Sequence, residues 1–313
     1  MRGSIIHQVQ TLFHESGINR LGHSKHADKE AFRASTDKKA TWNDIGQNTG
    51  IYSYSTADDY REIWITACKY AKAHFGLKHI ETITGEHLQA FLMSKIEAKV
   101  AHSTFMTYAA ALEKLAVALN MYAEKQGIDT KYTFSSDIRV ARKIAHKKLE
   151  RFDGVRSYDN PEELIEMLEN PHKLIASIQH IGGARIDEVY GIMPCSLKAK
   201  NRFTVKGKGG KIREIKIKPE DYTQLKTHLQ KEGNFKFNKA MYLYHLKIAS
   251  EKSKQKYNGS HGLRWNFAQN RMHELQKNGK VYEQGLVIVS QEMGHERADI
   301  TEHYLQFHIK EDH

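Results

Sequence analysis

The sequence predicts a mainly helical protein of two domains, the second of which contains a small antiparallel β-sheet. Three observations predict this fold class. All four prolines follow residue 160, so the first half can form long uninterrupted helices. Apolar residues repeat at helical spacing in that half. In the second half, apolar and polar residues alternate on both sides of a glycine-rich turn, a pattern typical of a hairpin.

The clearest helix of the first half is predicted to begin at Ser103, a residue that can cap it. Segments 60–75 and 86–96 predict two further helices, each with an apolar stripe, so residues 58–127 are expected to form a small helical bundle. Residues 1–57 are expected to add a helix near 5–13 and a polar connection. In the helix after Ser103, apolar residues recur three or four positions apart, at Phe105, Tyr108, Leu112, Leu115, Leu119 and Tyr122.

A basic segment joins the two halves. The stretch "IRVARKIAHKKLERFDGVR" (138–156) carries seven Lys/Arg and two acidic residues. Two interpretations fit this pattern: a solvated helix and linker, or a basic strap along the phosphates of a nucleic acid. Asn160 followed by Pro161 and two glutamates predicts the start of a new helix, so the domain boundary is placed just before it.

The second half is predicted to mix helices with one hairpin. Residues 164–180 fit a helix, and "RFTVKGKGGKIREIKIK" (202–218) fits a β-hairpin. Helices are expected from Pro219 onward, with breaks near 258–260 and 278–279.

Composition and charge narrow the classes of function. The chain is 40% hydrophobic and 27% charged, which is a globular composition. Its net charge of +11 points to a polyanionic partner, most often nucleic acid. Both halves are net positive, so one attached basic tail does not explain the charge.

Other sequence features favour a soluble protein without bound metal. No apolar run has the length of a membrane span, and the opening residues do not form a signal peptide. A cytoplasmic, nucleoid-associated protein is therefore expected. Cys68 and Cys195 are predicted to be free thiols, and the 19 histidines show no zinc-binding spacing, so no metal is predicted.

Four short stretches carry residues suited to chemistry. Each residue alone has an ordinary explanation: a structural ion pair, a solvated turn lysine, a chance pair on a helix, or a core tyrosine. Together they fit phosphoryl transfer, in which guanidinium groups bind the phosphate oxygens, a lysine protonates the leaving oxygen and a tyrosine attacks beside a base. The stretches are "GGARIDEVYGI" with Arg185, "KGKGGKIRE" with Lys208, "HGLRWNFA" with His261 and Arg264, and "MGHERADITEHY" with His295 and Tyr304.

In this order and spacing, the chain resembles the tyrosine recombinase (phage integrase) family. "ARIDE" matches the family's first arginine box, with Glu188 at its supporting acid. "GKGGKIR" matches the lysine hairpin, "HGLR" the His-x-x-Arg motif, and "MGHERADITEHY" the final box, with nine residues from histidine to tyrosine. The resemblance covers residues 160–304 and, more weakly, the helical segment 58–127.

The resemblance implies a fold and a domain division. The fold is mainly α with a small antiparallel β-sheet: a SAM-like helical core-binding bundle and an α+β catalytic domain, together forming a C-shaped clamp on DNA. The expected divisions are an N-terminal extension (1–57), the core-binding domain (58–137), a basic linker (138–159) and the catalytic domain (160–313).

The resemblance also implies a site-specific recombinase mechanism. Tyr304 attacks the scissile phosphate to form a 3′-phosphotyrosyl link, without ATP, metal or other cofactor. Pairs of exchanges pass through a Holliday junction in a homotetramer on two double-stranded DNA sites. The free protein is expected to be a monomer, and a DNA-bending accessory protein is a further expected partner. In the family's roles, Arg185, Arg264 and His295 stabilise the transition state, Lys208 is the acid, and His261 is the base and orienter.

The sequence departs from the family in places and leaves alternatives open. Trp265 and Asn266 stand where many relatives have His and Thr, and "QKNGKVYEQG" (276–285) is interpreted as an inserted surface loop. A type IB topoisomerase-like DNA-relaxing enzyme and a catalytically silent DNA-binding regulator are the alternative functions. The choice of acid among Lys206, Lys208 and Lys211 stays open. The residues expected to contact DNA are Arg139, Arg142, Lys143, Lys147, Lys148, Lys206 and Lys211.

Overall fold

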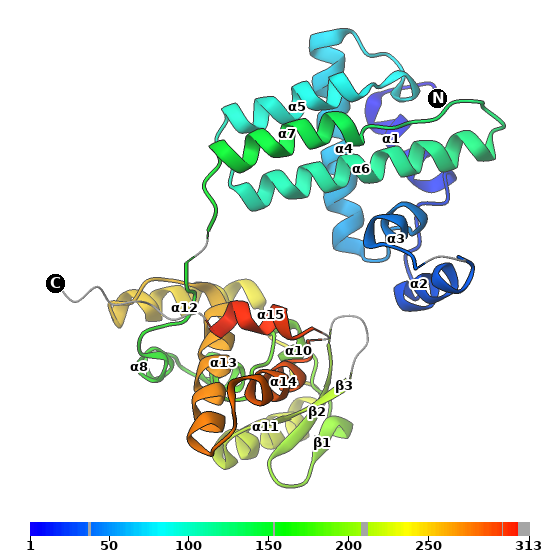
Figure 1. Cartoon of the computed structure of the whole chain (residues 1–313). Coiled ribbons are helices and arrows are strands. Elements are labelled where there is room, and N and C mark those ends of the chain that lie inside the picture. Colours follow the sequence, from blue (N-terminus) through cyan, green and yellow to red (C-terminus); the bar gives the residue numbers. More distant parts are fainter. Residues whose placement is uncertain (37–38, 153, 208–211, 296, 306–313) are drawn as a thin grey trace. The chain divides into compact units, whose positions relative to one another are not determined.

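The protein divides into two compact units, Met1–Asp153 and Gly154–His313 (Figure 1). The computed structural model describes all residues except 37–38, 153, 208–211, 296 and 306–313, and it does not describe the side chains of residues 42 and 43. Both units are mostly helical, and the second contains an antiparallel sheet of order β1-β2-β3. The predicted fold class, mainly α with a small antiparallel sheet, is confirmed.

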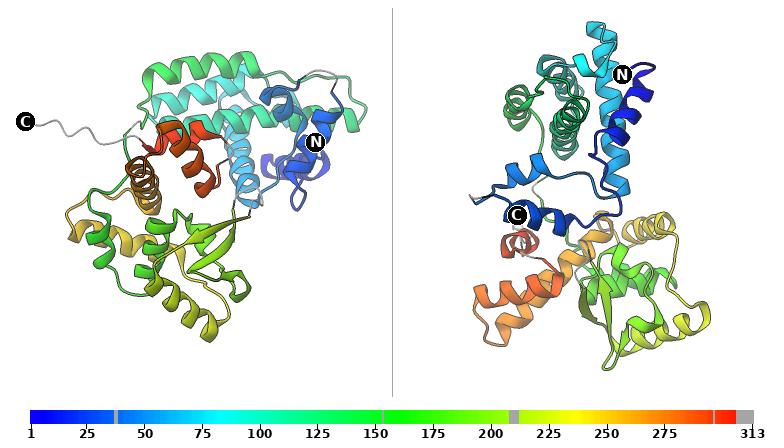
Figure 2. Two further views of the ribbon diagram at one scale, coloured as in Figure 1. Left: turned by 60° about the horizontal axis from the view of Figure 1, so that its bottom comes forward. Right: turned by 90° about the vertical axis from the view of Figure 1, so that its right-hand side faces the viewer.

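Helices α5, α6 and α7 of the first unit run side by side, and α1 lies along α4 (Figures 1 and 2). At the centre lies Trp64, which is fully buried and donates a hydrogen bond from Nε1 to the Ala111 carbonyl at 2.7 Å. The unit consists of α1 (Ile5–Glu15), α2 (Lys25–Ala34), α3 (Trp42–Asn48), α4 (Tyr54–Phe75), η1 (Ile80–Thr82), α5 (Gly85–Glu97), α6 (His102–Lys125) and α7 (Ser135–Lys148).

The apolar period predicted for α6 is confirmed, but its predicted cap is wrong. Phe105, Leu112, Leu115 and Leu119 are all buried. The helix begins at His102 after Ala101, and no side chain caps it, so Ser103 lies inside the first turn. Helix boundaries are set by contacts beyond the local sequence, and therefore shift by a residue or two.

The structure places two predicted segments differently from the sequence analysis. Residues 1–57 are not an extension, because Val9 and Leu12 of α1 are buried in the same core as α4. Residues 138–148 are not linker but most of α7, whose Ile138, Ala141 and Ala145 are buried in that core. The many charges of this helix obscured its narrow apolar face, which repeats every three or four residues.

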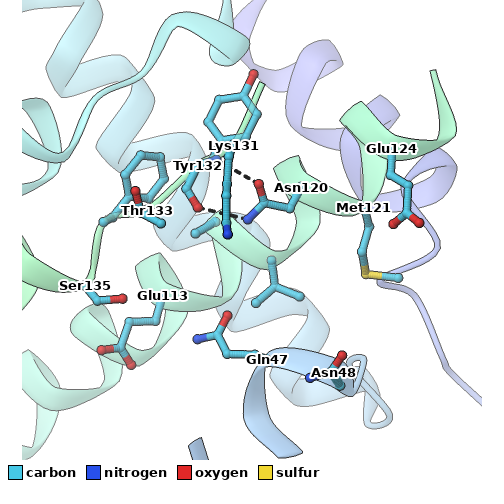
Figure 3. Close-up of a pocket in the computed structure, with 13 residues that line it drawn as sticks. Gln47, Asn48, Glu113, Asn120, Met121, Glu124, Lys131, Tyr132, Thr133 and Ser135 are labelled. Carbon is cyan, nitrogen blue, oxygen red and sulfur yellow. Dashed lines mark hydrogen bonds between the residues drawn. The ribbon is translucent and has the colours of Figure 1, made fainter. Parts of the chain in front are cut away.

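A cavity of about 640 Å³ opens between α3, α6 and the segment leading into α7 (Figure 3). On one side, the Asn120 side chain fixes this segment by accepting from the Tyr132 N–H at 2.7 Å and donating to its carbonyl at 2.9 Å. Glu113, which also lines the cavity, forms two hydrogen bonds with Arg142 of α7, at 2.7 and 3.0 Å. The cavity walls therefore help to hold α7 in the bundle.

The second unit packs its helices around the sheet and around α13. Asn160 caps α8 with Pro161 at the first position, as predicted. The unit consists of α8 (Pro161–Glu166), α9 (His172–Gly182), α10 (Ile186–Val189), η2 (Pro194–Ser196), β1 (Leu197–Lys198), β2 (Arg202–Lys206), β3 (Ile212–Lys216), α11 (Pro219–Glu232), α12 (Lys239–Lys252), α13 (Gly259–Lys277), α14 (Tyr282–Met293), α15 (Ala298–Glu302) and η4 (His303–Leu305).

The predicted hairpin is present, and its register explains the alternation. Phe203 pairs with Ile215, and Val205 pairs with Arg213, so these four residues share the buried face. The helix predicted over 164–180 is instead divided, because Pro171 lacks an N–H donor and restricts the residue before it. The stretch 276–285, expected as a surface loop, is helical at both ends, since α13 runs to Lys277 and α14 begins at Tyr282.

None of the described helices combines the length and the apolar character needed to cross a bilayer.

Replacing Ile138 by Ala should lower the free energy of unfolding of the first unit by about 2–5 kcal/mol, because it leaves a cavity in a packed core. Val140 lies on the same helix and is 45% exposed, so Val140→Ala should change stability by no more than about 0.5 kcal/mol. Urea unfolding followed by circular dichroism measures both variants. Equal effects would contradict the placement of α7 in the core.

Candidate active site

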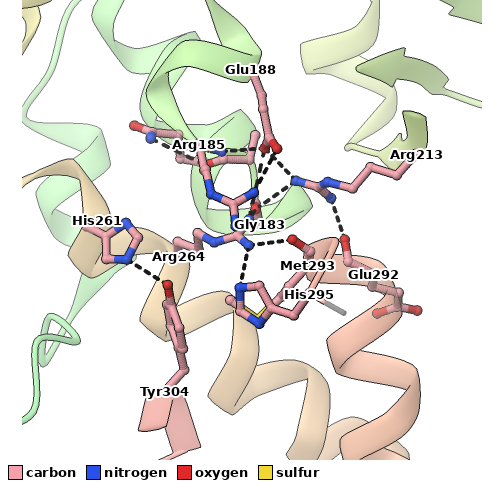
Figure 4. Close-up of polar contacts among 12 residues, drawn as sticks. Gly183, Arg185, Glu188, Arg213, His261, Arg264, Glu292, Met293, His295 and Tyr304 are labelled. Carbon is pink, nitrogen blue, oxygen red and sulfur yellow. Dashed lines mark hydrogen bonds and ion pairs between the residues drawn. The ribbon is translucent and has the colours of Figure 1, made fainter. Parts of the chain in front are cut away.

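The backbone carbonyl of Gly183 accepts hydrogen bonds from two arginines of the site. Gly183 follows α9 with φ of +60°, a left-handed conformation that glycine adopts without strain. A Cβ atom there would lie 2.4 Å from the Phe267 ring, so the position also requires a residue without a side chain. The carbonyl oxygen accepts hydrogen bonds from Arg213, at 3.1 Å, and from Arg264 (Figure 4).

Glu188 orients the first predicted arginine. Arg185 precedes α10, and its backbone N–H donates to Glu188 Oε2 at 2.7 Å, while its Nη1 donates to Oε1 at 2.9 Å. Burial opposes ionisation of the Glu188 carboxyl, but Arg213, Arg185 and their hydrogen bonds hold its pKa below the usual value. The Arg185 side chain is 28% exposed, so part of its guanidinium faces solvent.

Arg264 lies fully buried on α13, between three protein acceptors. Its Nη1 donates to the Gly183 carbonyl and its Nη2 to the Met293 carbonyl. The same Nη2 lies 3.1 Å from His295 Nε2. Its Nε is buried and has no hydrogen-bond partner among the described residues. The guanidinium is thus fixed in orientation before any ligand arrives.

His295 is held in a single tautomer by its two neighbours. A guanidinium only donates, so Nε2 must accept from Arg264, and the ring proton of the neutral imidazole lies on Nδ1. That proton is donated to Thr301 Oγ1, 2.7 Å away, and Thr301 also accepts from Ser290 at 2.7 Å. A left-handed Gly294 turns the chain after α14 and so brings His295 to this place.

The Tyr304 hydroxyl lies beside His261. The phenol oxygen is 2.8 Å from His261 Nε2, within the range for direct proton transfer. The Tyr304 ring is 8% exposed and lies between the rings of Trp265 at 5.3 Å, His295 at 5.3 Å and His261 at 5.4 Å. The Arg264 guanidinium lies 6.0 Å from the centre of the Tyr304 ring.

The site carries more positive than negative charge. Arg185, Arg213 and Arg264 surround the single buried carboxylate of Glu188. Burial, followed by the charges of Arg185 and Arg213, lowers the pKa of Arg264 to about 10. Such a cluster favours an anionic ligand, because a phosphate would offset a charge that the protein leaves uncompensated.

Both histidines are neutral in this charged setting. Burial, then the nearby guanidinium of Arg264, lowers the pKa of His261 to about 4 and that of His295 to about 3. A neutral His261 can accept the phenol proton at neutral pH. The arrangement therefore brings together a tyrosine hydroxyl, a neutral imidazole that can accept its proton, and guanidinium groups held by the protein.

The structure brings together Arg185, Glu188, His261, Arg264, His295 and Tyr304 in one site of the second unit (Figure 4). Lys208 and Lys211, also predicted from the sequence, lie outside the described residues. Lys206 ends β2 with an exposed side chain. Among the described residues, no group of three or more His, Cys, Asp or Glu side chains could hold a metal ion.

The basic residues of segment 138–148 differ in whether they are exposed to solvent or paired within the protein. Arg139, Lys143, Lys147 and Lys148 are exposed on α7. Arg142, which was expected to contact DNA, instead forms a two-contact ion pair with Glu113 inside the first unit. The Glu113 carboxylate therefore already neutralises part of the positive charge of Arg142.

Two departures from the family pattern have structural explanations. Trp265 is 1% exposed and forms a wall against the Tyr304 and His303 rings. Asn266 accepts from the Tyr158 N–H at 3.0 Å and donates to its carbonyl at 2.8 Å, so it fixes the segment that enters the second unit.

Sequence analysis missed Arg213 and Thr301. Arg213 is 9% exposed and reaches Glu188 with Nη2 at 2.7 Å. The alternation of β3 could have revealed it, because Arg213 is in phase with the buried Ile215. Thr301 gave no such signal, since its role depends on a contact between α15 and the loop after α14.

Comparison with solved structures identifies the fold. A XerH site-specific recombinase bound to a palindromic difH substrate in a post-cleavage complex matches 97% of this chain and 92% of its own, with a TM-score of 0.60 and 17% identity. The Tn1549 transposon integrase in complex with a circular intermediate DNA matches 91% of this chain and 95% of its own, with a TM-score of 0.55 and 12% identity. The chain has the tyrosine recombinase fold.

The tyrosine recombinase fold extends over both units, because a match to 97% of the chain includes the helical first unit as well as the second. No protein-family model matches the chain, and no curated protein sequence matches it. The match to solved structures therefore confirms, at the level of the fold, the resemblance noted from the short motifs.

His261 and His295 should both stay neutral in the free protein down to about pH 5. Their folded pKa values lie below the ordinary value of 6.5, so the unfolded chain binds protons first as the pH falls. Stability is therefore fully present above that value and declines as the pH drops towards the folded values. Long-range ¹H–¹⁵N spectra, assigned with His261→Gln and His295→Gln, follow the ring nitrogens directly. Titration of either ring near its ordinary pKa would contradict this electrostatic description.

Proposed function

We propose that the protein is a tyrosine site-specific recombinase that cuts and rejoins DNA through a phosphotyrosyl intermediate. One observation carries the proposal: the Tyr304 hydroxyl lies 2.8 Å from Nε2 of a neutral histidine, beside a cluster of guanidinium groups with excess positive charge. The fold supports it, because the similar XerH and Tn1549 structures are recombinase and integrase complexes with DNA.

In the proposed cleavage step, the Tyr304 oxygen attacks the scissile phosphorus as His261 Nε2 accepts the phenol proton. The new bond joins the phenol oxygen to phosphorus, and the bond from phosphorus to the 5′-oxygen breaks. The departing 5′-oxygen takes a proton from an acid, for which Lys208 is the family-based candidate. The products are a 3′-phosphotyrosyl link and a free 5′-hydroxyl, so the phosphodiester bond energy is retained without a nucleotide cofactor.

Arg185 and Arg264 are proposed to stabilise the charge that develops on the non-bridging oxygens. Loss of one preorganised donor of this kind costs roughly 3–4 kcal/mol of barrier, or about 10²–10³ in rate. Arg185 is the more accessible of the two, and Arg264 is the more rigidly held. His295 contributes by accepting from Arg264, and it keeps that guanidinium in place.

Rejoining to a partner strand extends the proposal to recombination. The 5′-hydroxyl of a second duplex attacks the phosphotyrosine, and two such pairs of exchanges pass through a Holliday junction. This sequence requires four protomers on two DNA sites. A monomer in free solution, a tetramer on DNA and a DNA-bending accessory protein are parts of the proposal.

Tyr304→Phe should abolish covalent adduct formation while DNA binding stays near normal, because only the phenol oxygen is lost. The substrate is a pool of nicked duplexes with randomised sequence, in which loss of a short 5′-hydroxyl fragment traps the adduct. SDS-stable complexes are isolated and their DNA is sequenced. Tyr257→Phe is the matched control, since this tyrosine lies in the same unit, just before α13, and is not among the residues of the site described above.

The unaltered protein and Tyr257→Phe should enrich the same duplexes, and Tyr304→Phe should enrich none. Equal enrichment by Tyr304→Phe would remove Tyr304 as the nucleophile, and absence of adduct with the unaltered protein would refute the function. Transfer of label between two enriched duplexes then separates a recombinase from a topoisomerase-like enzyme, which reseals the strand that it cut.

The exposed basic face of α7 is proposed to contact DNA phosphates. Changing Lys143, Lys147 and Lys148 together to Gln should flatten the dependence of log K on log salt by up to about three units, because each neutralised phosphate contributes about 0.9. Sequence preference should not change, since phosphate contacts position the protein while base contacts specify the site.

Binding of a random-sequence duplex across a salt series measures this slope. Lys69, Lys72 and Lys78 provide a control triple variant, because they are exposed in the same unit but lie on and just after α4. A slope that changes equally in both triple variants would mean that α7 has no special role in DNA binding.

A further inference from the structure

Arg213 connects three segments of the candidate active site. It lies on β3, the strand that follows the hairpin turn, and its side chain is 6% exposed. Its Nη2 donates to Glu188 Oε2 at 2.7 Å and to the Gly183 carbonyl at 3.1 Å. Its Nη1 donates to the Glu292 carbonyl near the end of α14 (Figure 4). One guanidinium thus contacts the residue that follows α9, a residue of α10 and the end of α14.

The acceptors of Arg213 are shared with the two arginines that face the proposed phosphate. Glu188 accepts from Arg213 and also from both the backbone and the side chain of Arg185. The Gly183 carbonyl accepts from Arg213 and also from Arg264. Arg213 therefore fixes the positions of the two groups that orient Arg185 and Arg264.

The turn before His295 is shaped around Arg213. Gly294 has φ of +71°, and a Cβ atom there would lie 3.1 Å from Arg213 Cδ and 3.4 Å from its Nε. A side chain at this position would press on the arginine stem as well as strain the backbone. The Gly294 turn therefore packs directly against Arg213. The residue after Gly294 is His295, whose Nε2 accepts from Arg264.

Arg202 shows what an ordinary arginine ion pair in this sheet looks like. It lies on β2 and donates to Glu214 at 3.1 Å, with both side chains about half exposed, at 48% and 49%. Such exposed pairs contribute little to stability. The buried and shared contacts of Arg213 distinguish it from this neighbour.

We infer that Arg213 is a positioning residue for DNA cleavage, one that holds Glu188, the Gly183 carbonyl and the Gly294 turn in register so that Arg185 and Arg264 meet the phosphate together. The inference rests on the proposed function and assigns a role within it to a residue that does not itself contact the reacting atoms. Removal of the guanidinium would leave the buried Glu188 with one cationic partner fewer and the Gly183 carbonyl with one donor fewer.

The test measures single-turnover adduct formation on a duplex enriched from the nicked pool, with saturating protein. Arg213→Ala should slow adduct formation by about 100-fold, the effect of a displacement of about 1 Å in a preorganised site. The equilibrium constant for binding the same duplex should change far less than the rate. Arg213→Lys should recover part of the rate, because an ammonium can still reach one or two of the three acceptors. Arg202→Ala is the matched control and should react like the unaltered protein.

Chemical rescue distinguishes positioning from general destabilisation. Added ethylguanidinium at low millimolar concentration should raise the rate of Arg213→Ala and leave that of Arg202→Ala unchanged, because only the former has a vacated guanidinium site. Thermal unfolding of each variant shows whether it is folded at the assay temperature. If Arg213→Ala is unfolded at that temperature, the test uses the rate of adduct formation by Arg213→Lys instead. A rate equal to that of the Arg202→Ala control would then overturn the inference.

The outcomes separate this inference from the proposed function. Adduct formation by the unaltered protein together with a normal rate in Arg213→Ala overturns the inference and leaves the function standing. A slow rate that neither lysine nor ethylguanidinium improves also overturns it, because the rate would then not depend on a cation at this position. No adduct with the unaltered protein overturns both.

Discussion

The buried carboxylate of Glu188 is the interaction on which the rest of the site depends. It is 2% exposed on its side chain and is the acidic partner shared by Arg185 and Arg213, with Arg264 only 4.0 Å away. A carboxylate cannot stay ionised in such a place without cationic partners, and closely spaced arginines cannot stay together without an anion between them. Each group therefore makes the position of the others possible.

This arrangement places three guanidinium groups around one carboxylate, and the excess of positive charge explains several other properties of the site. Burial, followed by the excess positive charge, lowers the pKa values of His261 and His295 and keeps both rings neutral, so the first can accept a proton and the second can accept from Arg264. The backbone carbonyls of Gly183, Glu292 and Met293 accept hydrogen bonds from the Nη groups of Arg213 and Arg264. In the proposed function, the DNA phosphate supplies the missing negative charge at the point where Tyr304 attacks.

The first unit combines an apolar interior with an exposed basic helix face. Its interior is apolar and packed around Trp64, while α7 directs its basic residues outward on the opposite side from Ile138, Ala141 and Ala145. Arg142 is the exception, because its pairing with Glu113 holds α7 to α6. A helix can thus be part of the core and present charge at the same time. Residues 138–148 of the basic segment 138–156 are thus helical, and the contact of this segment with phosphates stays a proposal.

The sequence by itself determined the fold class, the hairpin and part of the candidate site, because helical and strand periodicity and motif spacing are local properties. The period of Phe105 to Leu119 and the alternation around 202–218 both follow from which face of an element is buried. Only the tertiary structure decided which side chains share an acceptor. Arg213 and Thr301 lie 25 and 6 residues from their partners Glu188 and His295, and α7 is assigned to the first unit by contacts with α5 and α6. Such contacts depend on how elements pack in three dimensions, and no local pattern encodes the distance between two segments that the fold brings together.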